Sequence, residues 1–343
     1  MALYNQIRDA ALTKARNNYP NHEGATREVL DAHTVKSIKA TTKKFAEWIR
    51  SGGRYTRRDL FTTDSERNRA KEALQEYQMY LSIEYRKKNG EHLTPATIHT
   101  YLAYPCTALG VSMAEITKDK RTADTIKRSR RTQEGQNRRG DREAQSPRFG
   151  RLVDFQKAVG LRRGELEKLT GADLVRDESG YLCVRVLGGK GGKFQLQRVL
   201  PAHEGIVTAT MNTNGPTIFT AEEMNNDIDL HAMRAAHGME CYDYYAQRLE
   251  ADPAYKEELR RELRARYAAF NERPTDRHRH TFERDITNER PYRLRRNGSN
   301  YAIAIRDGKP VVYDRLALMA VSVLHLSHWR LDVSVTNYIL GGH

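Results

Sequence analysis

The stretch Y-L-C-V-R-V-L-G-G-K-G-G-K-F-Q-L-Q-R-V-L, residues Tyr181 to Leu200, decides the fold class of this 343-residue chain. Leu182, Val184 and Val186 alternate with other residues, which is the pattern of a half-buried strand. The glycine-rich segment 188–192 predicts a turn, and a return strand follows it. The second half of the chain therefore contains a β-hairpin whose tip carries lysine.

Helical patterns surround this hairpin. Residues 148–172 are patterned as a helix that breaks at Gly160, and a charged helix is expected at about 253–271. Two further short strands are expected at 301–305 and 311–313, joined through a turn at Asp307-Gly308. We therefore expect residues 148–343 to form a mainly α domain with a small antiparallel β-hairpin or sheet.

The first hundred residues are patterned for helices alone. Residues 34–51 carry apolar side chains on one helical face. Thr63 and Glu66 match a capping box, and Thr94-Pro95 begins another helix, which Pro105 is expected to break or kink. Residues 1–115 are therefore predicted to form a small all-helical domain.

A basic linker is predicted between the two domains, at residues 116–147. Residues 118–148 contain eleven basic and five acidic side chains, a surplus of six positive charges. The segment is interpreted as a strap along DNA phosphates or as a solvated connector, and the concentration of like charge favours the strap. The expected DNA-binding residues are Lys127, Arg128, Arg130, Arg131, Arg138 and Arg139.

The charge of the whole chain points to the same kind of partner. A formal net charge of +14 favours a polyanion, and nucleic acid comes before an anionic membrane because no basic amphipathic helix with a bulky apolar face is evident. No apolar run approaches the length of a membrane span, and residues 1–20 contain no apolar secretory segment. Three widely spaced cysteines, Cys106, Cys183 and Cys241, favour a reducing compartment.

Four short motifs carry candidate chemistry. The segment G-L-R-R-G-E-L occupies 160–166, and G-G-K-G-G-K occupies 188–193. The second lacks the Ser/Thr of a phosphate-binding P-loop and joins two strands, so a nucleotide site is rejected. The segment H-A-M-R at 231–234 places His and Arg on one helix face, and L-S-H at 326–328 is followed by Tyr338. Each motif alone is weak.

In this order the motifs resemble the tyrosine recombinase (phage integrase) family, over about residues 30–240 and 315–340. The resemblance implies an α-helical N-terminal core-binding domain and a mainly α catalytic domain that together clamp double-stranded DNA. It also implies a site-specific recombinase or integrase of a bacterial or phage mobile element, acting in the cytoplasm at the nucleoid. Such an enzyme would work as a homotetramer on paired sites, and a need for accessory DNA-bending proteins stays open.

The resemblance further implies a role for each motif residue. Tyr338 would attack a backbone phosphate and leave a 3′-phosphotyrosyl bond, so that neither ATP, metal nor another cofactor is required. Arg162 and Arg234 would clamp the phosphate oxygens. Lys190, or alternatively Lys193, would donate a proton to the leaving 5′-oxygen, and His231 would accept the proton of the tyrosine. His328 would donate a hydrogen bond to the phosphate, and Glu165 would support Arg162.

The chain departs from the family pattern in three respects. Ser327 stands where the family usually has glycine, and Ala235 follows Arg234 where a basic residue is common. Arg234 and His328 are 94 positions apart, far more than the family has, which predicts an insertion at about 245–314. The histidine-containing patch at 277–280 in this insertion has no neighbouring ligand set that would complete a metal site.

Two neighbours of the motif residues have other expected roles, and two other functions are alternatives. Arg163 is expected to contact the DNA backbone or to lie on the surface. His325 lies one helical turn before His328, and the L-x-H spacing favours His328 as the site residue. The alternatives to a recombinase are a type IB topoisomerase-like DNA-relaxing enzyme and a non-catalytic DNA-binding protein of the same fold.

Overall fold

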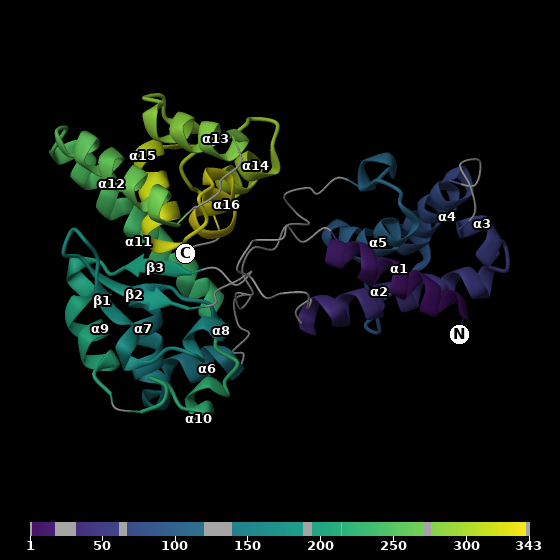
Figure 1. Ribbon diagram of the computed structural model, residues 1–343, viewed down its shortest axis with the longest axis horizontal. Coiled ribbons are helices and arrows are strands. Elements are labelled where there is room, and N and C mark those ends of the chain that lie inside the picture. The colour runs from purple at the N-terminus through teal and green to yellow at the C-terminus, as the bar shows by residue number, and fades with distance from the viewer. Residues whose placement is uncertain are drawn as a thin grey trace. The chain divides into compact units, whose positions relative to one another are not determined.

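The computed structural model of the chain describes residues 2–17, 32–61, 67–119, 139–187, 194–213, 215–270 and 276–340. The chain forms two compact units, Met1–Ile126 and Lys127–His343 (Figure 1). Both are built mainly of helices, and the second also contains a small three-stranded sheet. The boundary between the units lies inside the segment predicted as a linker.

The first unit is a helical bundle around one apolar core. Phe45, Leu74, Tyr77 and Leu102 are fully buried there, and burying each such side chain contributes about 1.5–3 kcal/mol. The described elements are α1 (Ala2–Asn17), α2 (Ala32–Gly52), α3 (Arg57–Phe61), α4 (Arg67–Met79), η1 (Tyr80–Glu84), α5 (Pro95–Leu109) and η2 (Met113–Glu115).

The predicted start of α5 is confirmed, and the predicted break at Pro105 is wrong. The Thr94 hydroxyl accepts a hydrogen bond from the amide of Thr97 at 3.4 Å, as an N-cap does. Pro105 does not end the helix, which continues to Leu109. Burial of Cys106 and Leu109 beyond the proline offsets the backbone hydrogen bond that proline removes. The predicted capping box at 63–66 lies outside the described residues.

The first part of the second unit contains the sheet. The predicted hairpin strands are confirmed as β2 and β3, which pair antiparallel with Val184 opposite Gln197, and a third strand, β1, was not predicted. The hairpin tip at 188–193 lies outside the described residues. The elements are α6 (Arg139–Gln145), η4 (Pro147–Phe149), α7 (Gly150–Val159), α8 (Arg163–Leu166), η5 (Gly171–Asp173), β1 (Leu174–Arg176), β2 (Leu182–Val186), β3 (Gln195–Arg198), η6 (Pro201–His203), α9 (Glu204–Met211) and α10 (Ala221–Met224).

The long helix α11 (Leu230–Ala251) joins two hydrophobic cores of this unit. Leu230 at its start belongs to the core formed by α7 and the sheet. Cys241, Tyr245 and Leu249 belong to the core shared with the C-terminal helices. Figure 1 shows α7 and α9 on one side of the sheet and α11, α12 and α15 on the other. Residues in the first two turns of α11 therefore lie where the two cores meet.

The predicted insertion is an integral part of the second core. The expected charged helix is confirmed as α12, and its Tyr255, Leu259 and Leu263 pack with Phe282 of α13 and with the C-terminal helices. The elements of this part are α12 (Tyr255–Phe270), α13 (Asp276–Thr287), β4 (Tyr292–Arg293), α14 (Ser299–Arg306), β5 (Val312–Tyr313), α15 (Arg315–Ala320), η7 (Val321–His325), α16 (Leu331–Ser334) and η8 (Val335–Ile339).

The hairpin predicted between 301 and 313 is wrong. Its first half is the helix α14, and β5 pairs instead with β4, with Tyr313 opposite Tyr292. Ile303 is fully buried and Ile305 is 60% exposed, because residues two apart point to different sides of a helix but to the same side of a strand. Gly308, with φ of 63°, follows the helix as its left-handed C-terminal residue rather than forming a hairpin turn.

Candidate active site

The predicted nucleophile Tyr338 lies on η8 with only 3% of its surface exposed. Its hydroxyl is 2.8 Å from Nε2 of His328, at hydrogen-bond distance. A tight turn sets this histidine, because Ser327 and Trp329 adopt φ of 52° and 58°. The backbone amide of His328 donates to the carbonyl of Ser322 at 2.8 Å, which ties the turn to η7. Ser327 stands where the family that the motifs resemble usually has glycine, and it occupies a left-handed position that favours glycine.

Arg234 is fully buried beside the same tyrosine. Its guanidinium carbon is 5.2 Å from the centre of the Tyr338 ring. The guanidinium donates to the carbonyl of Leu326 at 2.8 Å and to the carbonyl of Gly160. Among the described residues it forms no ion pair, and its Nε has no hydrogen-bond partner. Burial, the largest influence, lowers the pKa of Arg234 from its ordinary value. The arginine therefore holds two backbone segments together, and no ion pair among the described residues neutralises its charge.

His231 lies one helical turn before Arg234 on α11. Its ring centre is 5.6 Å from that of Tyr338. Partial shielding from water, followed by the positive charge of Arg234, lowers the pKa of His231 from its usual 6.5, although part of the side chain stays exposed. The imidazole is therefore neutral at pH 7. The structure places His328, rather than His231, at hydrogen-bond distance from the tyrosine hydroxyl.

Arg162 and Glu165 form a coupled pair at the start of α8. The guanidinium of Arg162 donates to Oε1 of Glu165 at 2.6 Å, and its backbone amide donates to Oε2 at 2.9 Å. Gln195 of β3 also donates to Glu165, at 3.4 Å. The charge of Arg162 helps to lower the pKa of both His231 and Arg234, so the pair lies within electrostatic reach of the tyrosine pocket. Gln195 was not predicted, because its role depends on strand register.

Arg163, which was expected to contact the DNA backbone or to lie on the surface, is half-buried and hydrogen-bonded within the protein. Its guanidinium donates to the carbonyls of Met224 and Ile228 at 2.8 and 2.9 Å, and to the side chain of Asn226 at 2.9 Å. Through these three hydrogen bonds, Arg163 stabilises the loop that precedes α11. His325 is fully buried in the core, where its Nε2 lies 3.1 Å from the hydroxyl of Tyr245.

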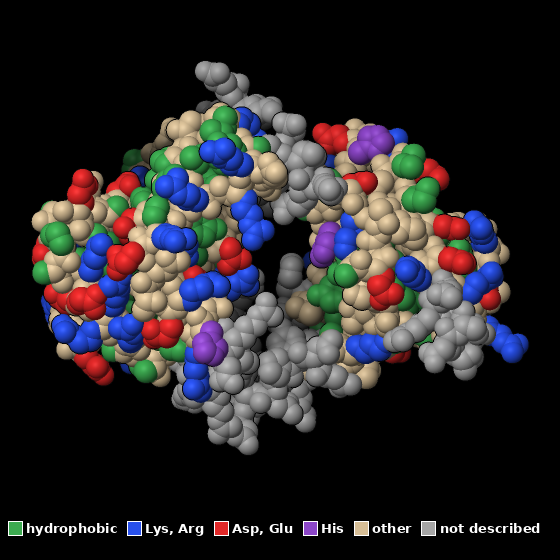
Figure 2. Space-filling view, turned by 90° about the horizontal axis from the view of Figure 1, so that it is seen from above, with side chains coloured by type: hydrophobic (Ala, Val, Ile, Leu, Met, Phe, Trp, Pro, Cys, Tyr) green, Lys and Arg blue, Asp and Glu red, His purple; other side chains and the backbone are tan. Residues whose placement is uncertain are grey.

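Most of the predicted basic contacts lie outside the described residues. These are the hairpin lysines Lys190 and Lys193 and the linker residues Lys127, Arg128, Arg130, Arg131 and Arg138. Arg139 is described: it is exposed on α6 and pairs with Glu143 at 2.8 Å and with Asp227 at 3.5 Å. Basic and acidic side chains are interspersed on the face of both units that Figure 2 shows.

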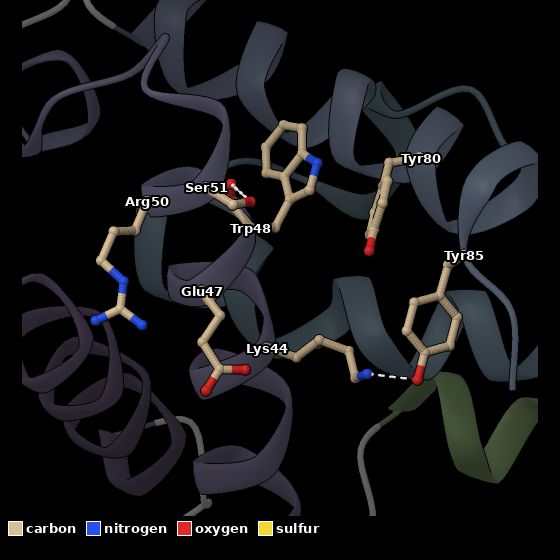
Figure 3. A pocket seen from close by; sticks show the side chains of 7 residues that line it. All are labelled: Lys44, Glu47, Trp48, Arg50, Ser51, Tyr80 and Tyr85. Atoms are coloured by element: carbon tan, nitrogen blue, oxygen red, sulfur yellow. Dashed lines mark hydrogen bonds between the residues drawn. The ribbon is translucent and has the colours of Figure 1, made fainter. Parts of the chain in front are cut away.

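The first unit contains a hollow of about 510 Å³ that sequence reasoning missed (Figure 3). Lys44 of α2 donates to the hydroxyl of Tyr85 at 2.7 Å and lies 4.0 Å from the centre of its ring. The rings of Trp48 and Tyr80 line the same hollow. Its sequence signal is the spacing of Lys44 and Trp48, four residues apart on one helix face. Aromatic rings beside a cation are a feature of surfaces that stack the bases of single-stranded nucleic acid, and the acidic Glu47 lines the same hollow.

The described residues contain no helix that is both long and apolar enough to cross a membrane. The chain matches no protein-family model, and no curated protein or solved structure matches it either.

Proposed function

We propose that this chain is a site-specific DNA recombinase that breaks and rejoins DNA through Tyr338. The observation that carries this proposal is the buried Arg234, which forms no ion pair among the described residues and lies against a tyrosine whose hydroxyl is 2.8 Å from a histidine. A buried charge is costly unless an anion joins it. A DNA phosphate supplies that anion at the place where a nucleophile is already held.

The proposed chemistry combines these groups with the other residues that the resemblance implies. The oxygen of Tyr338 attacks phosphorus while its proton passes to Nε2 of His328, and the bond from phosphorus to the 5′-oxygen breaks. Arg162 and Arg234 stabilise the charge that develops on the non-bridging oxygens. The leaving oxygen takes a proton from Lys190 of the hairpin tip, with Lys193 as the alternative. The covalent intermediate keeps the phosphodiester energy for rejoining, so no ATP is consumed.

The two histidines exchange the roles that the sequence indicated for them. Because His328 lies at the tyrosine hydroxyl, we assign proton acceptance to His328. His231, with its exposed edge and lowered pKa, is a neutral hydrogen-bond donor available to a phosphate oxygen. Glu165 fixes the orientation of Arg162 through the bond to its guanidinium.

Tyr338 must move before the reaction, because its ring covers Arg234 and is 3% exposed. The turn at 327–329 and the short helices α16 and η8 carry both the histidine and the tyrosine. A phosphate that enters the pocket would displace the ring and pair with the arginine behind it. DNA binding would thereby expose the nucleophile only where its substrate is present.

Two further features support DNA as the partner. The net charge of +14 favours a polyanion over the full chain. The hollow lined by Lys44, Trp48 and Tyr85 offers a cation and aromatic rings on the helical first unit, which corresponds to the expected core-binding domain. We propose that this unit contacts DNA through that surface and that active assemblies are homotetramers on paired sites.

The test is covalent trapping on a nicked suicide duplex. In such DNA the strand end diffuses away after cleavage, so that the phosphotyrosyl adduct accumulates and is visible on a denaturing gel. We expect an adduct without added ATP, and none after pre-digestion of the DNA. Mixing two labelled sites then separates recombination, which exchanges the labels, from relaxation of single duplexes. Failure to form any adduct over a range of target sequences that the protein binds tightly would contradict the proposal.

A further inference from the structure

Three metal-ligating side chains lie together in the second unit, apart from the residues assigned to the reaction. His237 and Cys241 are one turn apart on α11, and His325 comes from η7. They are buried, with exposed fractions of 1%, 0% and 0%. Their ligand atoms all lie within 4.8 Å of one another. Imidazole nitrogen and thiolate sulfur are the ligands that thiophilic metal ions prefer.

The surroundings orient two of these side chains as metal ligands are usually oriented. Nδ1 of His237 lies 3.1 Å from the carbonyl of Lys157. Because a carbonyl only accepts, Nδ1 carries the proton and Nε2 presents its lone pair, 3.5 Å from the sulfur of Cys241. Histidine ligands almost always donate their second ring N–H to such an oxygen.

His325 has a buried ring nitrogen that lacks a hydrogen-bond partner. Its Nε2 lies 3.1 Å from the hydroxyl of Tyr245. Its Nδ1 is buried and has no hydrogen-bond partner among the described residues. A buried polar atom without a partner costs about 1–3 kcal/mol, and a metal bond would satisfy it. In the tautomer in which Nε2 donates to Tyr245, Nδ1 carries the free lone pair that such a bond needs.

We propose that Nε2 of His237, Sγ of Cys241 and Nδ1 of His325 bind one thiophilic metal ion. Two ligands of one ion, a sulfur at about 2.3 Å and a nitrogen at about 2.0–2.1 Å, are about 3.6 Å apart at a tetrahedral angle and about 3.8 Å apart at the trigonal angle of a three-coordinate ion. The separation of 3.5 Å between Cys241 and His237 is close to both values. The widest pair, within 4.8 Å, has to close by about 1 Å. The thiol proton leaves to solvent as the sulfur–metal bond forms.

Charge balance selects the ion. With one thiolate, Zn²⁺ would leave a net charge of +1 in a buried site, and Cu⁺ would leave none. Arg234 lies one turn away on α11, and its positive charge, which forms no ion pair among the described residues, reaches His237. A buried net charge is expensive, and the three side chains are shielded from the bulk water that could supply a fourth ligand. A soft ion that accepts three ligands fits best, and Cu⁺ therefore precedes Zn²⁺.

The bound ion would stabilise the candidate active site without taking part in its chemistry. His325 is three residues before His328, and His237 is three residues after Arg234. Arg234 donates to the carbonyl of Leu326 in the same segment. An ion between α11 and η7 would therefore fix the distance between the two elements that carry the arginine and the histidine. The proposal itself rests on the three ligands and stands whether or not the chain cuts DNA.

The competing explanation is a plain core in which the Cys241 thiol donates to His237. A titration distinguishes this explanation from a metal site. The full-length protein, reduced and freed of metal, is titrated with Cu⁺ in competition with a Cu⁺-selective chelator. A parallel titration uses Co²⁺, whose thiolate complexes absorb in the near ultraviolet. We expect one Cu⁺ per chain and weaker Co²⁺ binding. At free Cu⁺ a hundred times the dissociation constant, the thermal midpoint of the second unit should rise by about 5–10 °C.

Matched variants locate the site. Cys241→Ser keeps the hydrogen bond to His237 but removes the soft ligand, and it should lose Cu⁺ binding and the thermal shift. Cys106→Ser and Cys183→Ser change equally buried thiols outside the cluster and should keep both. X-ray absorption of the copper-loaded wild type should show one sulfur and two nitrogens around the metal, a readout that does not depend on how any variant folds. Absence of stoichiometric binding, full binding by Cys241→Ser, or a different ligand set would overturn the proposal; Co²⁺ binding tighter than Cu⁺ would overturn the choice of ion.

Discussion

Gly238 lies in α11 directly against the tyrosine pocket. A methyl group added there would meet Cβ of Tyr338 at 3.3 Å and Cδ1 of Leu326 at 3.5 Å. The first separation is shorter than ordinary van der Waals contact, so the tyrosine backbone must shift by a few tenths of an ångström. We predict that Gly238→Ala displaces the nucleophile while leaving the fold intact.

The magnitude follows from two opposing contributions. Alanine favours a helix interior over glycine by about 1 kcal/mol, and overpacking of a well-filled site costs about 1–3 kcal/mol. The free energy of unfolding should therefore fall by about 0–2 kcal/mol. A misplacement of 1 Å can cost about a hundredfold in rate, so a few tenths of an ångström should slow cleavage by about 4- to 10-fold.

The assay is the single-turnover rate of adduct formation on suicide DNA, measured beside urea denaturation. Gly205→Ala on α9 is the matched control, because a methyl group there meets nothing within 4 Å. This control should keep the wild-type rate and gain up to about 1 kcal/mol of stability. If Gly238→Ala behaved as Gly205→Ala does, the close packing of α11 against Tyr338 would be refuted.

Three further predictions concern the turn, pH and salt. Ser327→Gly should raise the free energy of unfolding by about 1 kcal/mol in urea, because φ of 52° strains a non-glycine residue; an unchanged or lower value would contradict the left-handed turn. The pKa of His231 is lowered in the folded state, so the unfolded chain binds more protons below pH 6.5, and the free energy of unfolding should fall as the pH drops through that value. The free energy of unfolding of His231→Gln should fall less over the same range. Parallel curves of this free energy against pH for the two proteins would reject the shift. Replacing Arg128, Arg130 and Arg131 by Gln should reduce the slope of log affinity against log salt by about 2 to 3, whereas an unchanged slope would make the segment a mere connector.

Elements with one dominant periodicity were predictable from the sequence. The alternation at 182–186 and the helical spacing at 34–51 appear in the structure as β2 and α2. The segment at 301–305 failed because a five-residue apolar pattern fits both periods, and tertiary packing of Ile303 selected the helix. β1 is three residues long and owes its existence to pairing with β2, which no local pattern encodes.

The candidate site was predictable where its residues belong to short motifs. His328 and Tyr338 were expected to be neighbours, and they lie at hydrogen-bond distance. The sequence did not indicate that Arg234 would be fully buried, since its burial depends on carbonyls 74 and 92 residues away. The His237, Cys241 and His325 cluster was missed for the same reason: His325 meets the other two only through the packing of η7 on α11.

The identity of the nucleophile is the central claim, and peptide mapping of the trapped adduct tests it most directly. The covalent complex with suicide DNA is digested with protease and nuclease, and the residue that carries the remaining nucleotide is located by mass spectrometry. Tyr338 should carry it, and Tyr338→Phe should bind DNA without forming an adduct, whereas Tyr301→Phe on α14 should react as the wild type does. A nucleotide attached to any other residue, or an adduct formed by Tyr338→Phe, would contradict the account.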